Sequence, residues 1–207
     1  RLVGTWTRDL DTDRMPATIT RYVLDLAGEL GEHLVDEAAL AEHARALCEL
    51  IESAPRAKRQ GEKPSGKLRE IVTAQRFRLA LLPLVHEYAL RKRAEGAVDF
   101  ADQMAMAARL AGGHPEVGAA ERERYAAVLL DEYQDTGHAQ RVMLRSLFGA
   151  TSSAERDAGP GVIAVTAVGD PAQAIYGWRG ASAANLPRFT TDFPRVHEGK
   201  LAPAVQY

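Results

Sequence analysis

Hydrophobic residues recur every three or four positions through the first half of the chain. Between residues 18 and 53 this spacing predicts amphipathic helices with a break near Gly31. Four of these apolar positions share one helical face: Leu40, Ala44, Leu47 and Ile51. The same period returns between residues 67 and 93, where Pro83 predicts a kink or a break.

Between these helical stretches, residues 54–66 contain two prolines and two glycines and no apolar period, which predicts a loop. Asp99 is a good N-cap residue for a helix from Phe100 to about Leu110. The pattern therefore predicts an all-helical first half.

The pattern changes near Tyr125, where two short apolar runs replace the helical period. Residues 126–130 and the β-branched run 162–168 are typical of buried strands in a parallel sheet. Residues 138–148 have the length and period of a crossover helix, and residues 149–161 form a polar loop. These elements predict a β-α-β unit, in which ligands bind at the carboxyl ends of the strands.

Composition restricts the class of protein. The 207 residues are 46% hydrophobic and 26% charged, with a net charge of -2, which suits one large domain or two small ones. No apolar run approaches ~20 residues and no leader opens the chain, so we expect neither a membrane protein nor a secreted one. Cys48 is the single cysteine, which excludes an internal disulfide and favours the cytoplasm. Because the chain starts at Arg1 and stops soon after a strong motif, we expect a piece of a longer protein.

Charge is unevenly distributed along the helical half. Residues 25–52 contain eight acidic and one basic side chain, whereas residues 56–93 contain eleven basic and three acidic ones. The basic segment could bind a phosphate backbone. The alternative is a solvated helix face that pairs with the acidic segment.

Polar residues follow both predicted strands. Asp131 and Glu132 open the hexapeptide Asp-Glu-Tyr-Gln-Asp-Thr, and adjacent carboxylates at a strand end suit nucleotide hydrolysis, one binding Mg²⁺ and the other polarising a water. The second strand leads into Val-Gly-Asp-Pro-Ala-Gln-Ala-Ile-Tyr-Gly-Trp-Arg-Gly-Ala at 168–181. Its amide and its aromatic residues beside an arginine predict a platform on which unpaired bases stack.

These two segments resemble motifs II and III of the superfamily 1 DNA helicases of the UvrD/Rep/PcrA type. Residues 98–102, Val-Asp-Phe-Ala-Asp, resemble the segment by which chains of that family return from a helical insertion, subdomain 1B, to the first RecA-like motor domain. The resemblance implies an α/β fold, with part of a RecA-like P-loop motor domain and its parallel sheet, and a 1B-type helical insertion. It places the insertion at residues 1–97 and the second half of motor domain 1A at residues 98–207.

The resemblance also implies a role for individual residues. Asp131 would bind Mg²⁺, Glu132 would be the general base, and Gln173 would contact the γ-phosphate of ATP. Tyr176 and Trp178 would stack on single-stranded bases, and Arg179 beside them would contact either DNA or an acidic residue of motif II. A core position is the alternative for each of the two aromatic residues.

Two expected parts of such a motor, a phosphate-binding loop and the arginines of a second RecA-like domain, are not evident in this sequence. Residues 61–67 fit the phosphate-loop pattern Gly-x-x-x-x-Gly-Lys, but Leu68 replaces the required Ser or Thr and no apolar strand precedes the segment. We interpret it as a basic loop of the insertion. Without a phosphate loop and the arginines of a second motor domain, we expect this chain alone to be inactive.

The sequence therefore predicts a fragment of an ATP-dependent 3′-to-5′ DNA helicase of DNA repair or recombination. ATP and Mg²⁺ are its expected cofactors. Single-stranded and junction DNA and a nuclease or repair-protein partner are expected, and a membrane is not. A motor-like subunit of a helicase-nuclease complex whose ATPase has decayed is the first alternative, and Asp131, Glu132 and Gln173 argue against it. A P-loop NTPase without a nucleic-acid role is the second, and the cluster at 176–179 argues against it.

Overall fold

The chain divides into two compact units in the computed structural model. Unit 1 comprises Arg1–Leu30 and Val35–Val98, and unit 2 comprises Gly31–Leu34 and Asp99–Tyr207. The structure describes residues 2–6, 10, 13–55, 64–149, 163–177, 181–182, 184–197 and 200–202. The division after Val98 falls one residue from the boundary expected from sequence, but the short segment between the first two long helices belongs to unit 2.

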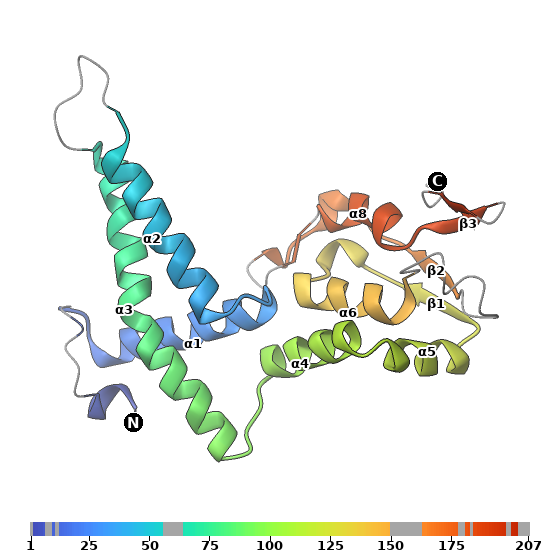
Figure 1. Ribbon diagram of the computed structural model, residues 1–207, viewed down its shortest axis with the longest axis horizontal. Helices are drawn as coiled ribbons and strands as arrows, with labels where there is room; N and C mark the ends of the chain where they lie inside the picture. The colour runs from blue at the N-terminus through green and yellow to red at the C-terminus, as the bar shows by residue number, and fades with distance from the viewer. Residues whose placement is uncertain are drawn as a thin grey trace. The chain divides into compact units, whose positions relative to one another are not determined.

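The described residues of unit 1 form helices and their connecting segments, and no strand, as predicted (Figure 1). The 3-10 helix η1 (Val3–Thr5) precedes three α-helices: α1 (Pro16–Glu32), α2 (Glu37–Ser53) and α3 (Gly66–Ala94). The break between α1 and α2 follows Gly31 by a few residues, and Asp36 caps α2 by accepting the N–H of Ala39 at 2.7 Å. Most of the predicted loop lies at residues 56–63, outside the described residues.

Of the two outcomes expected at Pro83, a kink or a break, the break is wrong, because α3 continues through this residue. A proline inside a helix removes one hydrogen bond and crowds the preceding turn. Burial on both sides compensates this cost, since Leu81, Leu82, Leu84 and Val85 are all buried in the core that α3 forms with α1 and α2.

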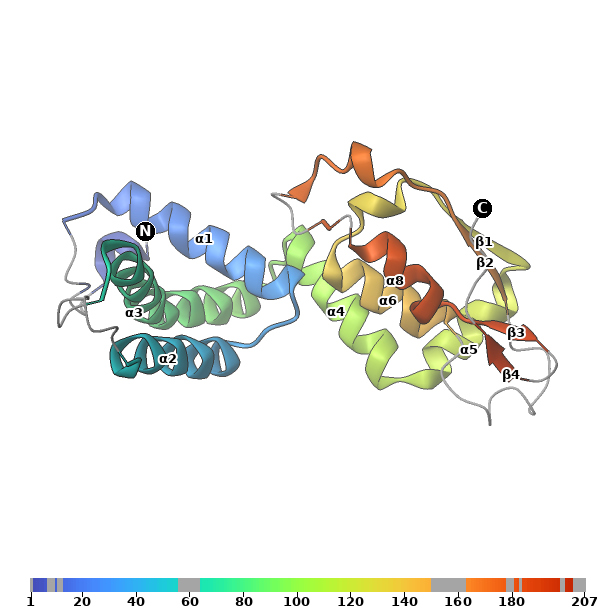
Figure 2. The same ribbon diagram turned by 90° about the horizontal axis from the view of Figure 1, so that it is seen from above.

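Unit 2 begins with two helices and continues into the predicted β-α-β unit (Figure 2). Its elements are α4 (Phe100–Gly113), α5 (Pro115–Arg124), β1 (Ala127–Leu130), η2 (Tyr133–Asp135), α6 (His138–Phe148), β2 (Ala164–Ala167), η3 (Pro171–Gln173), α8 (Asn185–Asp192), β3 (Arg195–His197) and β4 (Lys200–Ala202). Asp99 caps α4, as the sequence predicts, and Asp102 completes a capping box with it. Helix α5 was not predicted.

Strands β1 and β2 pair in parallel, with Ala127 opposite Ala164 and Leu130 opposite Ala167, which confirms the predicted arrangement. Helix α6 occupies the predicted crossover residues. The expectation that both strands are buried is wrong for this chain, because alternate residues on each strand are exposed. Leu129 is 81% exposed. The described helices of unit 2 lie to one side of the strands, so no described element covers the opposite face (Figures 1 and 2).

Segment 31–34 is attached to unit 2 by close contacts. A Cβ on Gly31 would lie 3.4 Å from the Cβ of Ala101, and the rings of His33 and His138 stack with centroids 6.5 Å apart. This segment therefore packs beside the start of both α4 and α6.

No helix in the described part of the chain is both long enough and apolar enough to cross a membrane.

Candidate active site

The two acidic residues predicted from the sequence lie directly after β1. Asp131 and Glu132 are both exposed, and the Asp131 Oδ1 accepts the backbone N–H of Glu132 at 3.0 Å. Glu132 has φ 52° and ψ 40°, in the left-handed region. Residues other than glycine are rare in this region, because the left-handed conformation costs them roughly 1 kcal/mol or more. The turn therefore holds Glu132 in a conformation that the chain would not adopt by local preference.

Hydrogen bonds between main-chain groups join this turn to the end of β2. The N–H of Val168 donates to the carbonyl of Leu130 at 2.8 Å, and the N–H of Tyr133 donates to the carbonyl of Val168 at 3.0 Å. Because parallel strands end at the same edge of the sheet, this pairing brings the segments after β1 and β2 together.

Gln134 connects the two segments through its side chain. It is fully buried, its Nε2 donates to Glu132 Oε2 at 2.5 Å, and its Oε1 accepts the N–H of Asp170 at 3.1 Å. Gly169 permits this approach, since a Cβ there would lie 2.5 Å from the Gln134 Oε1. A residue with a side chain at 169 would therefore displace the amide.

The turn after β2 carries the third predicted residue, Gln173. Asp170 accepts the N–H of Ala172 at 2.9 Å and the Nε2 of Gln173 at 2.8 Å. Both hydrogen bonds lower the pKa of the Asp170 carboxyl below its ordinary value, and the bond from the Gln173 side chain has the larger effect. Asp170 thus stays ionised and holds both the turn and the exposed Gln173 amide in place.

Of the three predicted DNA-binding residues, the structure describes Tyr176. Tyr176 is 40% exposed in the described part of the chain, which favours a surface position over a core position. It lines a pocket of about 370 Å³ with Phe100 and Met104 of α4 and Gln140 of α6. Phe100 is 86% exposed. Trp178 and Arg179 lie outside the described residues.

The segment that mimics a phosphate loop belongs to unit 1, whereas Asp131 belongs to unit 2. Residues 61–63 lie outside the described part of the chain, and Gly66 and Lys67 open α3 behind the cap residue Ser65. Helix α2 precedes this loop, so the strand that a phosphate loop requires is replaced by a helix. This supports its interpretation as a loop of the helical unit.

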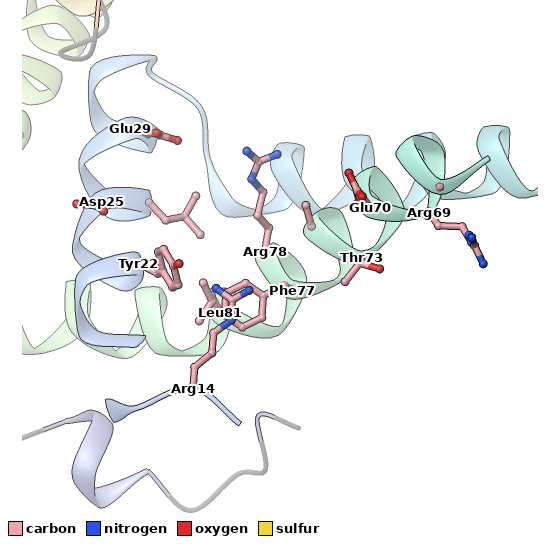
Figure 3. A pocket seen from close by; sticks show the side chains of 13 residues that line it. Arg14, Tyr22, Asp25, Glu29, Arg69, Glu70, Thr73, Phe77, Arg78 and Leu81 are labelled. Carbon is pink, nitrogen blue, oxygen red and sulfur yellow. The ribbon is translucent and has the colours of Figure 1, made fainter. Parts of the chain in front are cut away.

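Basic residues of α3 face acidic ones within unit 1. A groove of about 840 Å³ lies between α1 and α3, with Tyr22, Phe77 and Leu81 at its floor (Figure 3). The guanidinium of Arg14 lies 4.6 Å from the centre of the Phe77 ring. The charged lining residues have both signs: Asp25, Glu29, Glu70, Arg14, Arg69 and Arg78. Arg76 also pairs with Glu52 at 2.6 Å, so charge pairing between the basic and acidic segments is part of the fold.

Residues 9–194 match the family model described as the UvrD/REP helicase N-terminal domain. The chain belongs to the UvrD/Rep helicase family.

Three relatives show how much of such proteins the chain represents. It is 39% identical over 115 residues to "ATP-dependent DNA helicase UvrD1" of Mycobacterium bovis, which covers 56% of this chain and 14% of the relative. It is 40% identical over 106 residues to "DNA helicase II" of Escherichia coli, covering 51% and 13%. "DNA helicase II" of Rickettsia typhi is 36% identical over 110 residues, covering 53% and 15%. The chain spans only a small part of the length of these relatives.

In this UvrD/Rep family chain, further residues stabilise the turn after β1, and the sequence did not indicate this role. Tyr133 is fully buried and contacts Phe189 edge to face at 5.5 Å between ring centres. Asn185 donates to the carbonyl of Thr136 at 2.6 Å. Gly169 was the one detectable signal, because a glycine immediately after a strand often marks a close approach of other atoms.

Replacing Tyr133 with phenylalanine is expected to leave stability at neutral pH unchanged or slightly higher. Within the described residues its hydroxyl is buried and has no hydrogen-bond partner, so its removal leaves no group unsatisfied. Burial first, and then the Asp192 charge, raise the pKa of Tyr133 from 10.0 to about 12.

At alkaline pH, the Tyr133→Phe variant should be more stable than the wild type. A raised pKa in the folded state means that stability is complete below pH 10.0 and is lost as pH rises toward about 12. The phenylalanine variant lacks this loss, so its Tm should exceed that of the wild type increasingly above pH 10.0. Thermal unfolding across this range measures the difference, and parallel curves would show that Tyr133 ionises freely.

Proposed function

We propose that this chain is part of an ATP-dependent DNA helicase that moves 3′ to 5′ along single-stranded DNA. Unit 2 would form the second half of the RecA-like motor domain 1A, and unit 1 the helical 1B-type insertion. The main support is the connection at the strand ends, where Gln134 bonds both the carboxylate of Glu132 and the turn after β2. Membership of the UvrD/Rep family supports the same proposal.

In this proposal, Glu132 accepts the proton of the attacking water and Gln173 contacts the γ-phosphate. Asp131 would hold the Mg²⁺ that accompanies ATP. The described residues contain no cluster of three or more metal-ligating side chains, and a single carboxylate suits a cation whose other ligands are phosphate oxygens and water. When bound, the magnesium ion neutralises charge on the phosphates.

The DNA-binding part of the proposal rests on Tyr176, Trp178 and Arg179. Tyr176 follows the turn that contains Gln173, and its ring is exposed enough to stack on a base. Single-stranded and junction DNA are the proposed nucleic acids. The proposal extends to DNA repair with a nuclease or repair-protein partner, and to the cytoplasm as the compartment.

Strand displacement by the intact parent protein tests this function. With ATP and Mg²⁺, it should separate a duplex that carries a 3′ single-stranded tail and leave a matched duplex with a 5′ tail intact. Its ATP turnover should rise when single-stranded DNA is added. Displacement from the 5′ tail would contradict the direction, and tight DNA binding without any turnover would favour the decayed-motor alternative.

A further inference from the structure

Four residues form one hydrogen-bonded series across the candidate site, which passes through the side chains of Glu132, Gln134 and Gln173 and through both the backbone N–H and the carboxylate of Asp170. Glu132 Oε2 accepts from Gln134 Nε2 at 2.5 Å, and the Gln134 Oε1 accepts the N–H of Asp170 at 3.1 Å. The Asp170 Oδ2 then accepts from Gln173 Nε2 at 2.8 Å. The series begins at Glu132, in the turn after β1, and ends at Gln173, in the turn after β2.

Gln134 is the one member of this series that is fully buried. A buried amide is stable only when its donor and acceptor are both satisfied, and here each is satisfied by a different strand end. The amide also has little room to move, since a Cβ at Gly169 would lie 3.2 Å from the backbone N of Gln134 as well as against its side chain. A shift of one partner is therefore passed to the other.

We propose that Gln134 is a positioning residue that couples the γ-phosphate contact at Gln173 to the orientation of the general base Glu132. This proposal rests on the function proposed above. The Gln134 amide fixes one carboxylate oxygen of Glu132 by donating to it. The other oxygen can then accept from the attacking water in one orientation. When Gln173 engages a phosphate, Asp170 moves with it, and the amide transmits this change to Glu132.

The test uses the intact parent protein with Gln134→Leu. This substitution removes the hydrogen-bond donor and acceptor of the side chain but leaves an apolar side chain of similar size. We expect kcat for DNA-stimulated ATP hydrolysis to fall about 10²-fold, the loss typical of a misplaced catalytic group. KM for ATP and the Kd of a fluorescent ATP analogue should change less than about twofold, because Gln134 contacts no nucleotide in this proposal. Gln134→Met, with an unbranched side chain of similar length, serves if the leucine variant does not fold.

A double variant, Gln134→Leu with Gln173→Ala, distinguishes coupling between the two residues from independent structural roles. If the two residues act through one series, the double variant should be about as slow as the slower single variant. If they act independently, the two fold-losses should multiply, and this result would overturn the proposal.

Gln75→Leu is the matched control. Gln75 is a buried glutamine of α3 in unit 1 whose Oε1 has no hydrogen-bond partner among the described residues. Its replacement should leave kcat unchanged. A fall in Tm of the Gln134 variants with unchanged kcat would make Gln134 merely structural and overturn the coupling alone. A wild-type parent that shows no DNA-stimulated turnover would overturn the proposed function itself, and the coupling with it.

Discussion

Replacement of Glu132 by glutamine in the intact parent protein should reduce kcat for ATP hydrolysis by roughly 10²- to 10⁴-fold, the usual contribution of a general base. The amide has nearly the shape of the carboxylate but cannot accept the proton of the attacking water. Its oxygen can still accept the bond that Gln134 Nε2 donates to Glu132 Oε2. The turn and the nucleotide site should therefore keep their structure.

The measurement is steady-state ATP turnover with saturating single-stranded DNA, together with nucleotide binding at equilibrium. Binding should stay within about threefold of the wild type while turnover falls, because only the transition state is affected. Glu121→Gln is a suitable control, since Glu121 lies on α5, before β1, and pairs only with Arg124 among the described contacts. Equal losses of binding and turnover would identify Glu132 as a structural residue of the turn.

The β-α-β unit could be predicted because each of its parts has a local signal. Two short apolar runs end in acidic or glycine-aspartate sequences, and an amphipathic stretch of suitable length lies between them. Helix α6 then begins and ends at the predicted residues, His138 and Phe148. The capping of α4 by Asp99 was equally local, since it needs only a side chain that reaches three residues ahead.

Tertiary features were not accessible in the same way. Pro83 predicts a kink or a break, and the break does not occur because the burial of leucines around it keeps α3 continuous. The apolar run of β1 predicts burial on both faces, yet Leu129 is exposed because no described element covers that face. Both errors arise because a local pattern does not reveal which surfaces lie against the strand or helix.

For the site, the sequence indicated Asp131, Glu132 and Gln173 but not how they are connected. Gln134 occurs in a polar hexapeptide, and nothing local indicates that it is fully buried or that it reaches Asp170, 36 positions along the chain. This connection depends on the parallel register of β1 with β2. The sequence does not indicate this register, and the connection therefore requires the structure, in which the two strand ends lie side by side.

The largest loss of stability is expected when Asp192, at the end of α8, is replaced by alanine. The Arg141 Nη1 donates to both of its carboxylate oxygens, at 2.8 and 2.6 Å, and joins α6 to α8. The side chains are only 12% and 4% exposed. This pair could not be identified from the sequence, because each of the two charged residues is typical of an amphipathic helix and 51 positions separate them.

Removing the carboxylate leaves the Arg141 guanidinium mostly buried without its counter-charge. Breaking a buried pair in this way typically costs about 3 to 5 kcal/mol, or roughly a hundred- to several-thousand-fold in the folding equilibrium. Denaturant unfolding should show this as a lower midpoint with an unchanged slope. The exposed Glu87–Arg91 pair of α3 is the control, and Glu87→Ala should cost at most about 0.5 kcal/mol.

A second variant distinguishes loss of charge pairing from loss of packing. In Arg141→Met with Asp192→Leu, no charge stays buried, so much of the lost stability should return. Phe189, on the same helix α8 as Asp192, packs on the buried ring of Tyr133. Asp192→Ala should therefore also loosen the turn that holds Glu132 and lower ATP turnover in the parent, whereas the double variant restores it. Full stability of Asp192→Ala would show that the pair contributes no net energy and that the other contacts of α8, those of Phe189 and Asn185, are sufficient to fix it.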